Sequence, residues 1–248
     1  MDSGAGGGGG GGASGSGSSS RGGAGGGGAA AGGGGAGGPA DGAAGGQVAV
    51  PRPVPRPARN IQLKVGLLGD SYVGKTSLMV KYVENRFDED YIQTLGINFM
   101  EKIITLRERT VTFTIFDLGG GENEFNSMIP LVCADASAIL FMFDLTRRLT
   151  LQSIKEWYRQ ARGFNHVFVP LLVGTKFDTF ASFAVERQQD TLANARKFAR
   201  AMHAPLIFTS ASHSINVQKL FKIVLAIRFN LKCNVPRMSN PGQPIIEY

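Results

Sequence analysis

The sequence predicts an α/β fold in which helices cover both faces of a mostly parallel sheet. Short, nearly all-apolar runs, which are typical of strands buried on both faces, alternate with longer segments whose apolar residues recur at helical spacing. Strands that alternate with helices favour parallel pairing. Ligands of such sheets bind beyond the carboxyl ends of the strands, so we expect the functional residues to follow the strands directly.

Six segments are expected to be strands. The run at 61–68 ends at Gly69, and the run at 138–143 has no polar residue, so both are predicted to be buried. Residues 97–106 and 110–116 alternate in polarity and are separated by a short polar segment, which predicts a hairpin. Two further short apolar runs complete the set: 167–173 and 206–208.

Four segments carry the apolar spacing of a helix. The segment 186–202 reads as a long helix, and 76–85 is expected to be helical because four of its apolar residues share one face. The other two are recognised by their apolar stripes: Leu151, Ile154, Trp157 and Ala161 in one, and Leu220, Val224, Ile227 and Leu231 in the last.

The first 60 residues differ in composition from the rest of the chain. They hold 25 of its 35 glycines, and such a segment buries too little apolar surface to offset the entropy lost on ordering. We expect residues 1–60 to be a disordered Gly/Ala-rich and then Pro/Arg-rich tail, either a spacer or a docking arm. Residues 61–235 should form one globular domain, and residues 236–248 a flexible C-terminal tail.

Charge and cysteine content exclude several classes of protein. The formal net charge is +7, with an excess of basic residues after position 214, which is typical of a solvated helix face and could also favour an acidic partner or an anionic membrane. Basic and aromatic residues do not interleave, so nucleic acid is not expected as a partner. Two cysteines without metal-ligand spacing argue against a disulfide scaffold or a zinc site. No apolar run of transmembrane length and no secretory signal are present, so we expect a soluble, cytoplasmic protein.

A phosphate-binding signature follows the first strand. Residues 69–76, GDSYVGKT, match GxxxxGK[ST] between an expected strand and an expected helix. Glycines let backbone N–H groups surround an anion, and the helix N-terminus adds partial positive charge. Lys75 is expected to reach the outer phosphates and the Thr76 hydroxyl to hold Mg²⁺. The expected nucleotide contacts here are Gly69, Asp70, Ser71, Tyr72, Val73, Gly74, Lys75, Thr76 and Ser77.

Two later strand ends favour guanine as the base. In the segment VGTKFD, the Asp178 carboxylate can accept hydrogen bonds from a ring N–H and an exocyclic amine, a donor pair that guanine has and adenine lacks. The stem of Lys176 can lie over the base, and the Ala211 N–H can donate to the guanine carbonyl. The alternative is that Asp178 only caps the end of a strand. The expected base contacts are Thr175, Lys176, Asp178, Ser210, Ala211 and Ser212.

These segments together resemble a Ras-superfamily small GTPase, a P-loop NTPase, from about residue 61 to 235. Within the superfamily the chain is most similar to the septum-promoting, mitotic-exit GTPases of fungi and their plant relatives. The resemblance is carried by KVGLLGD, GKTSLMVKYVE, FDEDYIQTLGINFMEK, FDLGG, LVCADASAILFMFDLTR, SIKEWYRQARGFN, LVGTKFD and SHSINVQKLFK. It implies a mostly parallel six-stranded sheet with one antiparallel edge strand, and GTP or GDP with Mg²⁺ as ligands. It also explains Thr175, where most small GTPases have Asn, and a hydroxyl there is expected to reduce base affinity somewhat.

The resemblance assigns the switch loops as well. It implies that the Thr94 hydroxyl binds Mg²⁺, that Asp117 holds the ion through water, and that the Gly120 N–H contacts the γ-phosphate. In the family, Gln is expected directly after Gly120 and orients the attacking water, but this sequence has Gly121 followed by Glu-Asn. The change has two explanations: a genuine loss of hydrolytic function or a wrongly joined exon. The catalytic positions are therefore Lys75, Gly120 and Gly121, the last without its side chain.

The family role implied by the resemblance is control of cytokinesis and mitotic exit. Its partners would be a protein kinase effector, an exchange factor and a GTPase-activating protein, and these would recruit the chain to spindle-associated or nuclear structures. No CaaX cysteine ends the sequence, so a direct lipid anchor is not expected. A hydrolysing switch enzyme and a GTP-binding module that hardly turns over are the main alternatives, ahead of an ATP-using P-loop enzyme.

Overall fold

The computed structural model describes residues 59–90, 92–106, 109–119 and 126–248. The chain divides into two units, Met1–Pro53 and Val54–Tyr248, and every element below belongs to the second. The expectations for residues 1–58, and those for Gly120 and Gly121, lie outside the described residues.

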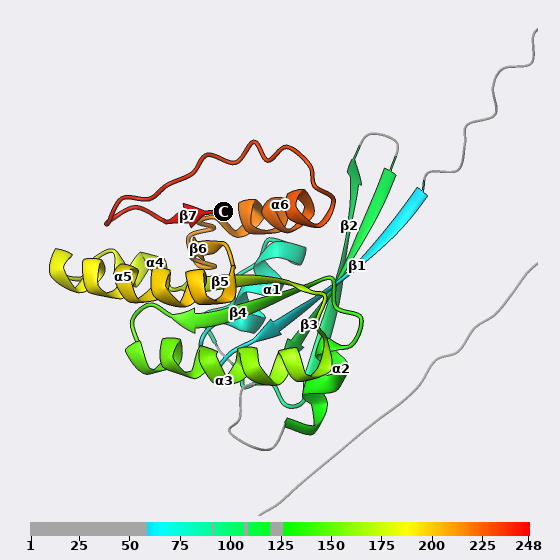
Figure 1. Ribbon diagram of the computed structural model, residues 1–248, viewed down its shortest axis with the longest axis horizontal. Coiled ribbons are helices and arrows are strands. Elements are labelled where there is room, and N and C mark those ends of the chain that lie inside the picture. The colour runs from blue at the N-terminus through cyan, green and yellow to red at the C-terminus, as the bar shows by residue number, and fades with distance from the viewer. Residues whose placement is uncertain (1–58, 91, 107–108, 120–125) are drawn as a thin grey trace, which may run out of the picture. The chain divides into compact units, whose positions relative to one another are not determined.

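The strands form one seven-stranded sheet in the order β2-β3-β1-β4-β5-β6-β7 (Figure 1). β3, β1, β4, β5 and β6 run parallel, while β2 pairs antiparallel with β3 as the expected hairpin. All six expected strands are present, with ends shifted by at most two residues. The strands are β1 (Arg59–Leu68), β2 (Ile97–Leu106), β3 (Arg109–Leu118), β4 (Ala138–Asp144), β5 (Val169–Thr175), β6 (Leu206–Phe208) and β7 (Ile246–Glu247).

Helices cover both faces of the sheet, as expected. On β4, Leu140 and Met142 pack into the apolar cluster that α1 and α6 share, and Phe141 and Phe143 pack into the cluster of α2, α3 and α5. Because alternate residues enter opposite clusters, every residue of β4 is buried. The helices are α1 (Lys75–Glu84), α2 (Ile129–Cys133), α3 (Arg148–Phe164), α4 (Phe177–Phe180), α5 (Val185–Met202) and α6 (Val217–Arg228), with a 3₁₀ turn at Asn126–Met128.

The last helix is shorter than its apolar stripe predicts. α6 ends at Arg228, and Leu231 lies beyond it with 53% of its surface exposed. Asn230 has a φ of 50°, a left-handed conformation that helices cannot continue through. The Leu231 N–H instead donates to the Ala226 carbonyl at 2.8 Å, so the chain turns away at this point.

The C-terminal residues differ from the expected flexible tail. β7 pairs antiparallel with β6, with Ile207 opposite Ile246, and adds a seventh strand to the six expected (Figure 1). Ile245 and Ile246 are buried at 1% and 0% exposure. Two adjacent apolar residues near a chain end are too short a pattern to predict a strand, and their burial depends on a partner strand that is distant in sequence.

None of the helices among the described residues is both long enough and apolar enough to cross a membrane.

Replacement of Ile246 by Ala should destabilise the protein by about 2–4 kcal/mol, because it leaves a cavity beside β6. Urea unfolding of the purified chain measures this difference. Leu231→Ala, at an exposed position of the same C-terminal region, is the control and should change the free energy of unfolding by less than about 0.5 kcal/mol. Equal stability of Ile246→Ala and the unaltered protein would mean that the C-terminal residues are a free tail in solution.

Candidate nucleotide-binding site

The parallel register brings the expected site residues to one edge of the sheet. Leu67, two residues before Gly69, lies opposite Asp117, and Asp144 at the end of β4 lies opposite Thr175. β6 ends one residue before Thr209, beside β5. Loops that are distant in sequence therefore start from neighbouring strand ends.

Backbone conformation gives the first loop its shape. Gly69 has a φ of 152°, and a Cβ there would lie 2.2 Å from the Met142 carbonyl oxygen, so only glycine fits. Gly74 has a φ of 91° and caps α1 without a side-chain hydrogen bond. The first N–H groups of α1 are therefore free of a side-chain cap, which suits an anion at this helix end.

Lys75 is held inside this loop. Its Nζ donates to the backbone oxygens of Gly69 and Asp70, both at 2.9 Å, and the residue is buried. Burial lowers the pKa of Lys75, and the nearby carboxylates of Asp117 and Asp70 offset part of that effect. A polyanion placed in the loop would stabilise the charged ammonium group further.

Three expected metal residues meet beside Lys75. The Thr76 and Thr94 hydroxyl oxygens lie 2.7 Å apart, and the Thr76 hydroxyl donates to Oδ2 of Asp117. Asp117 is fully buried, and its Oδ1 has no hydrogen-bond partner among the described residues. Burial raises the pKa of Asp117 despite the opposing effects of Thr76, Lys75 and Thr94.

This corner fits a magnesium ion. An unpartnered buried carboxylate oxygen is costly unless a cation or donor satisfies it, and Mg²⁺ prefers hard oxygen ligands such as hydroxyl and carboxylate groups. Among the described residues no cluster of three His, Cys, Asp or Glu side chains could hold a metal ion without other ligands. The oxygens of a bound phosphate would have to complete the coordination.

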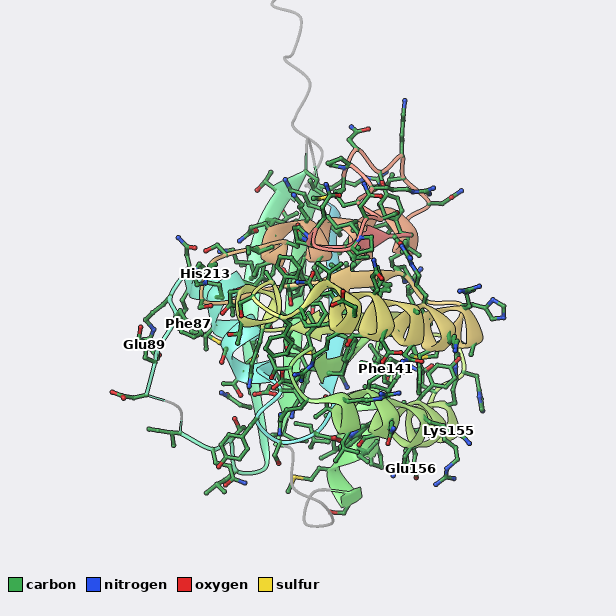
Figure 2. The ribbon with its side chains drawn as sticks, turned by 90° about the vertical axis from the view of Figure 1, so that its left-hand side faces the viewer. Phe87, Glu89, Phe141, Lys155, Glu156 and His213 are labelled. Carbon is green, nitrogen blue, oxygen red and sulfur yellow. The ribbon has the colours of Figure 1, made fainter. Side chains whose placement is uncertain are left out.

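A pocket of about 250 Å³ lies next to the loop, on the side of β5 and β6. Figure 2 shows Phe87, Glu89 and His213 gathered on one edge of the protein, away from Lys155 and Glu156 of α3. The pocket is lined by Tyr72, Gly74, Ser77, Leu78, Phe87, Asp88, Glu89, Thr175, Lys176, Asp178, Thr179, Thr209, Ala211 and Ser212.

The Asp178 side chain is held in the ionised form, which can only accept hydrogen bonds. Burial alone would raise its pKa, but hydrogen bonds from Ser210, from its own backbone and from Thr179 lower the pKa below the usual range, with a further contribution from His213. Asp178 lies in the first turn of α4, whose cap residue is Lys176. The carboxylate is therefore ionised at neutral pH and lines the pocket.

Thr175 connects the base side to the phosphate loop. Its hydroxyl lies 2.6 Å from the Val73 oxygen and 3.0 Å from the Phe143 oxygen, and the residue is buried. A hydroxyl has one hydrogen, so the Thr175 hydroxyl donates its only hydrogen bond to a protein oxygen and has none left for a base. The expected reduction in base affinity remains a prediction.

Ser210 and Ser212 bond to each other and within their own loop, and Ser210 also bonds to Asp178. Their hydroxyl oxygens lie 3.0 Å apart, and Ser210 Oγ also accepts from the His213 N–H at 3.1 Å. Ser77 and Phe87 line both the larger pocket and a second pocket of about 180 Å³ that also includes Thr76. The metal corner and the base side are thus neighbouring parts of one site.

A buried acid missed by the sequence analysis holds the site together. Asp144 Oδ2 lies 2.8 Å from Lys176 Nζ and 2.9 Å from Arg147 Nε, and Arg147 donates to the Ser71 oxygen at 2.8 Å. Burial alone would raise the pKa of Asp144, but hydrogen bonds from Lys176 and Thr146 lower it. An acid that closes the apolar run AILFMF is the signal that could have identified it.

Two aromatic residues were also missed. Trp157 of α3 donates its indole N–H to Oδ1 of Asp70 at 2.8 Å, which fixes one side of the phosphate loop. Phe87 presents an aromatic ring to the pocket and is 37% exposed. A partly exposed Phe within the charged stretch Arg86 to Asp90 could have drawn attention to it, whereas the spacing of Trp157 indicated only a core position.

Comparison with known proteins agrees with this geometry. The model of the Ras family matches residues 64–228, which is more than half of the chain. Septum-promoting GTP-binding protein 1 of Schizosaccharomyces pombe is 60% identical over 189 residues, covering 76% of this chain and 95% of that protein. Ras-related protein Rab-22A is 33% identical in Mus musculus over 162 residues and 30% identical in Homo sapiens over 161 residues, in both cases covering 64% of this chain and 80% of the relative.

The family match runs from the middle of β1 to the end of α6, and so includes every strand end that carries an expected site residue. The chain belongs to the Ras family of GTPases.

Proposed function

We propose that the chain is a molecular switch that binds GTP or GDP together with Mg²⁺ at the carboxyl edge of its sheet. The observation that carries the proposal is the convergence of a buried lysine, an unpartnered buried carboxylate and an ionised pocket carboxylate within one site: Lys75, Asp117 and Asp178. A nucleoside triphosphate with a guanine base offers the matching groups, namely anionic phosphates, a bound cation, and a ring N–H beside an exocyclic amine.

Each part of the nucleotide has its own set of residues. The phosphates would lie against the backbone of residues 69–77 and against Lys75, with Mg²⁺ held by Thr76 and Thr94 and, through water, by Asp117. The bound ion would neutralise charge between the outer phosphates. Phe87 would cover the base, and Lys176 would lie against its other side while Asp144 fixes the ammonium group.

Guanine suits the pocket better than adenine. Asp178 is an acceptor at neutral pH, and Ala211 lines the same pocket, where its backbone N–H would donate to the guanine carbonyl. Adenine places an amine where guanine has its carbonyl, so it would face the wrong groups. An ATP-using enzyme is therefore disfavoured.

The switch itself would depend on Thr94 and Gly120. Thr94 lies in the metal corner, where its hydroxyl contacts Thr76 and hydrogen-bonds to Asp117. A γ-phosphate and its cation would add contacts to Thr94 that GDP lacks, and would therefore hold this loop more firmly. Gly120 would contact the γ-phosphate through its backbone N–H. Ordering of these loops would create the surface that an effector recognises.

The cellular role proposed is control of septation or cytokinesis. It is supported by the 60% identity to a protein named for septum promotion and GTP binding. By analogy with its family, the switch would act on a protein kinase effector and would be regulated by an exchange factor and a GTPase-activating protein. These partners would recruit it from the cytoplasm to spindle-associated or nuclear structures.

A second candidate is a GTP-binding interaction module with little hydrolysis. The observation that favours it is Gly121 at the position of the family's Gln. Glycine has no side chain to orient water, and an ionised Glu122 would only accept hydrogen bonds and would add negative charge near the phosphates. This alternative shares the site and differs only in turnover.

Replacement of Asp178 by Asn should weaken GTP binding by roughly 2 kcal/mol or more, because an amide donor would face the guanine amine. Competition of GTP and xanthosine triphosphate against a fluorescent nucleotide measures the two affinities. The affinity for xanthosine triphosphate should rise while the affinity for GTP falls. Thr179→Ala, which removes the neighbouring hydroxyl bond to Asp178, is the control and should have a small effect. Unchanged GTP affinity in Asp178→Asn would remove the base assignment.

Replacement of Thr76 by Ala should uncouple nucleotide binding from Mg²⁺, because it deletes the hydroxyl that meets Thr94 and Asp117. In Mg²⁺, GDP should leave the variant at least tenfold faster, and chelation with EDTA should then add little. Thr76→Ser keeps the hydroxyl and should behave like the unaltered protein. An undiminished response to EDTA in Thr76→Ala would contradict the metal role of Thr76.

Replacement of Gly121-Glu122-Asn123 by Gln-Arg should raise GTP hydrolysis at least tenfold, or about 1.4 kcal/mol in barrier, because it restores an amide that can orient water. Single-turnover hydrolysis of GTP-loaded protein measures the rate. GDP affinity is the control and should not change, since Gly120 and Asp117 stay in place. Equal, rapid hydrolysis by the unaltered chain would show that another group positions the water.

A further inference from the structure

One side chain joins the base loop to the C-terminal strand. Asn216 donates from Nδ2 to the Phe208 oxygen at 2.9 Å and to the Pro244 oxygen at 3.0 Å, and it is buried. Phe208 is the last residue before the segment Thr209–Ser212, and Asn216 is the first residue after the loop that this segment begins. The amide therefore ties the entry and the exit of the base loop to each other and to residue 244.

The loop between these points is closed on itself. Ser210 and Ile215 exchange both backbone hydrogen bonds, at 3.1 and 2.9 Å. A loop closed by such a bridge moves as one piece, so the place of Ala211 in the pocket depends on how its two ends are anchored. β6 and α6 hold the two ends separately, and the Asn216 side chain ties the ends directly to each other.

The C-terminal segment is a firm support for the anchor. The Phe208 N–H donates to the Ile245 oxygen at 2.9 Å, and β7 continues the pairing with β6. Met238 and Ile246 form a second bridge, with hydrogen bonds of 3.0 and 2.8 Å. Arg196 of α5 binds Glu247, and the Tyr248 hydroxyl donates to the Val235 oxygen at 2.6 Å. Figure 1 shows this segment returning from α6 to lie beside β6.

We propose that Asn216 is a positioning residue for guanine-nucleotide binding, and that the C-terminal strand β7 is the support through which it holds the base loop. The inference rests on the proposed function, since it assigns the loop 210–215 to the base. Preorganisation lowers the entropy that binding must otherwise remove, so loss of the anchor should appear mainly as faster nucleotide release.

The choice of variant follows from the backbone. Asn216 has a φ of 57°, a left-handed conformation that Asn and Gly tolerate best, so Asn216→Gly removes the amide without forcing strain. Asn165 is a matched control, because its Nδ2 also bridges two backbone oxygens, those of Cys133 at 2.9 Å and Ala136 at 3.1 Å. Neither Asn216 nor Asn165 lines the site.

The test measures the rate at which fluorescent GDP is released in the presence of Mg²⁺ from three proteins: the unaltered full chain, Asn216→Gly and Asn165→Gly. The melting temperature of each protein is measured as well. Asn216→Gly should release GDP at least fivefold faster, while Asn165→Gly, with a similar loss of melting temperature, should change release less than twofold. The acceleration by EDTA should stay as in the unaltered chain, because the metal corner is untouched. Ile246→Ala, which loosens β7 without touching Asn216, should also accelerate release at least threefold.

Three outcomes would count against these assignments in different ways. If the unaltered chain binds no GDP, the proposed function itself fails. If it binds GDP and Asn216→Gly releases it at the unaltered rate, or no faster than Asn165→Gly, the positioning role is overturned. If Asn216→Gly is fast but Ile246→Ala is not, the amide acts on the loop without the support of β7, and that part of the inference is wrong.

Discussion

Five parallel strands end at one edge of the sheet, and the arrangement of the site depends on how closely those ends pack. Gly69 passes so near the Met142 carbonyl that a Cβ would lie 2.2 Å from it, and a Cβ on Gly174 would lie 2.9 Å from both Leu145 and Phe208. A side chain at position 69 would collide with the backbone of β4 and push the phosphate loop away from that strand, whereas one at position 174 would force the Leu145 and Phe208 side chains to repack. Gly69 therefore sets the spacing between the phosphate loop and β4, and Gly174 leaves room for the side chains packed around the end of β5.

Two buried aspartates at this edge show how the same residue type serves two purposes. Asp144 is surrounded by donors from Lys176, Arg147 and Thr146, and its pKa is lowered despite burial, so it acts as a fixed anchor for other side chains. Asp117 is buried with one oxygen unpartnered among the described residues, and its pKa is raised. The first charge is satisfied by the protein, whereas the second is suited to a cation that arrives with the nucleotide.

Local patterns predicted most of the site because its chemistry lies in contiguous motifs. The phosphate loop and the segment VGTKFD each follow an apolar run directly, so residue type and spacing were sufficient to assign Lys75, Thr76 and Asp178. Asp144 and Trp157 were missed because their importance comes from partners far away in sequence, at Lys176 and Asp70. β7 was missed for the same reason: Ile245 and Ile246 form a strand only against β6. The end of α6 depended on a single left-handed residue, Asn230, which apolar periodicity does not detect.

The nucleotide carried by the purified full chain tests most directly whether this edge binds guanine nucleotide. Denaturing the protein and separating the released nucleotides by chromatography should yield GDP or GTP in an amount equal to the protein, with Mg²⁺ required to retain it through purification. Release of adenine nucleotide instead would contradict the base assignment. Recovery of no nucleotide, together with failure of the protein to take up added GDP in Mg²⁺, would contradict the proposed function as a whole.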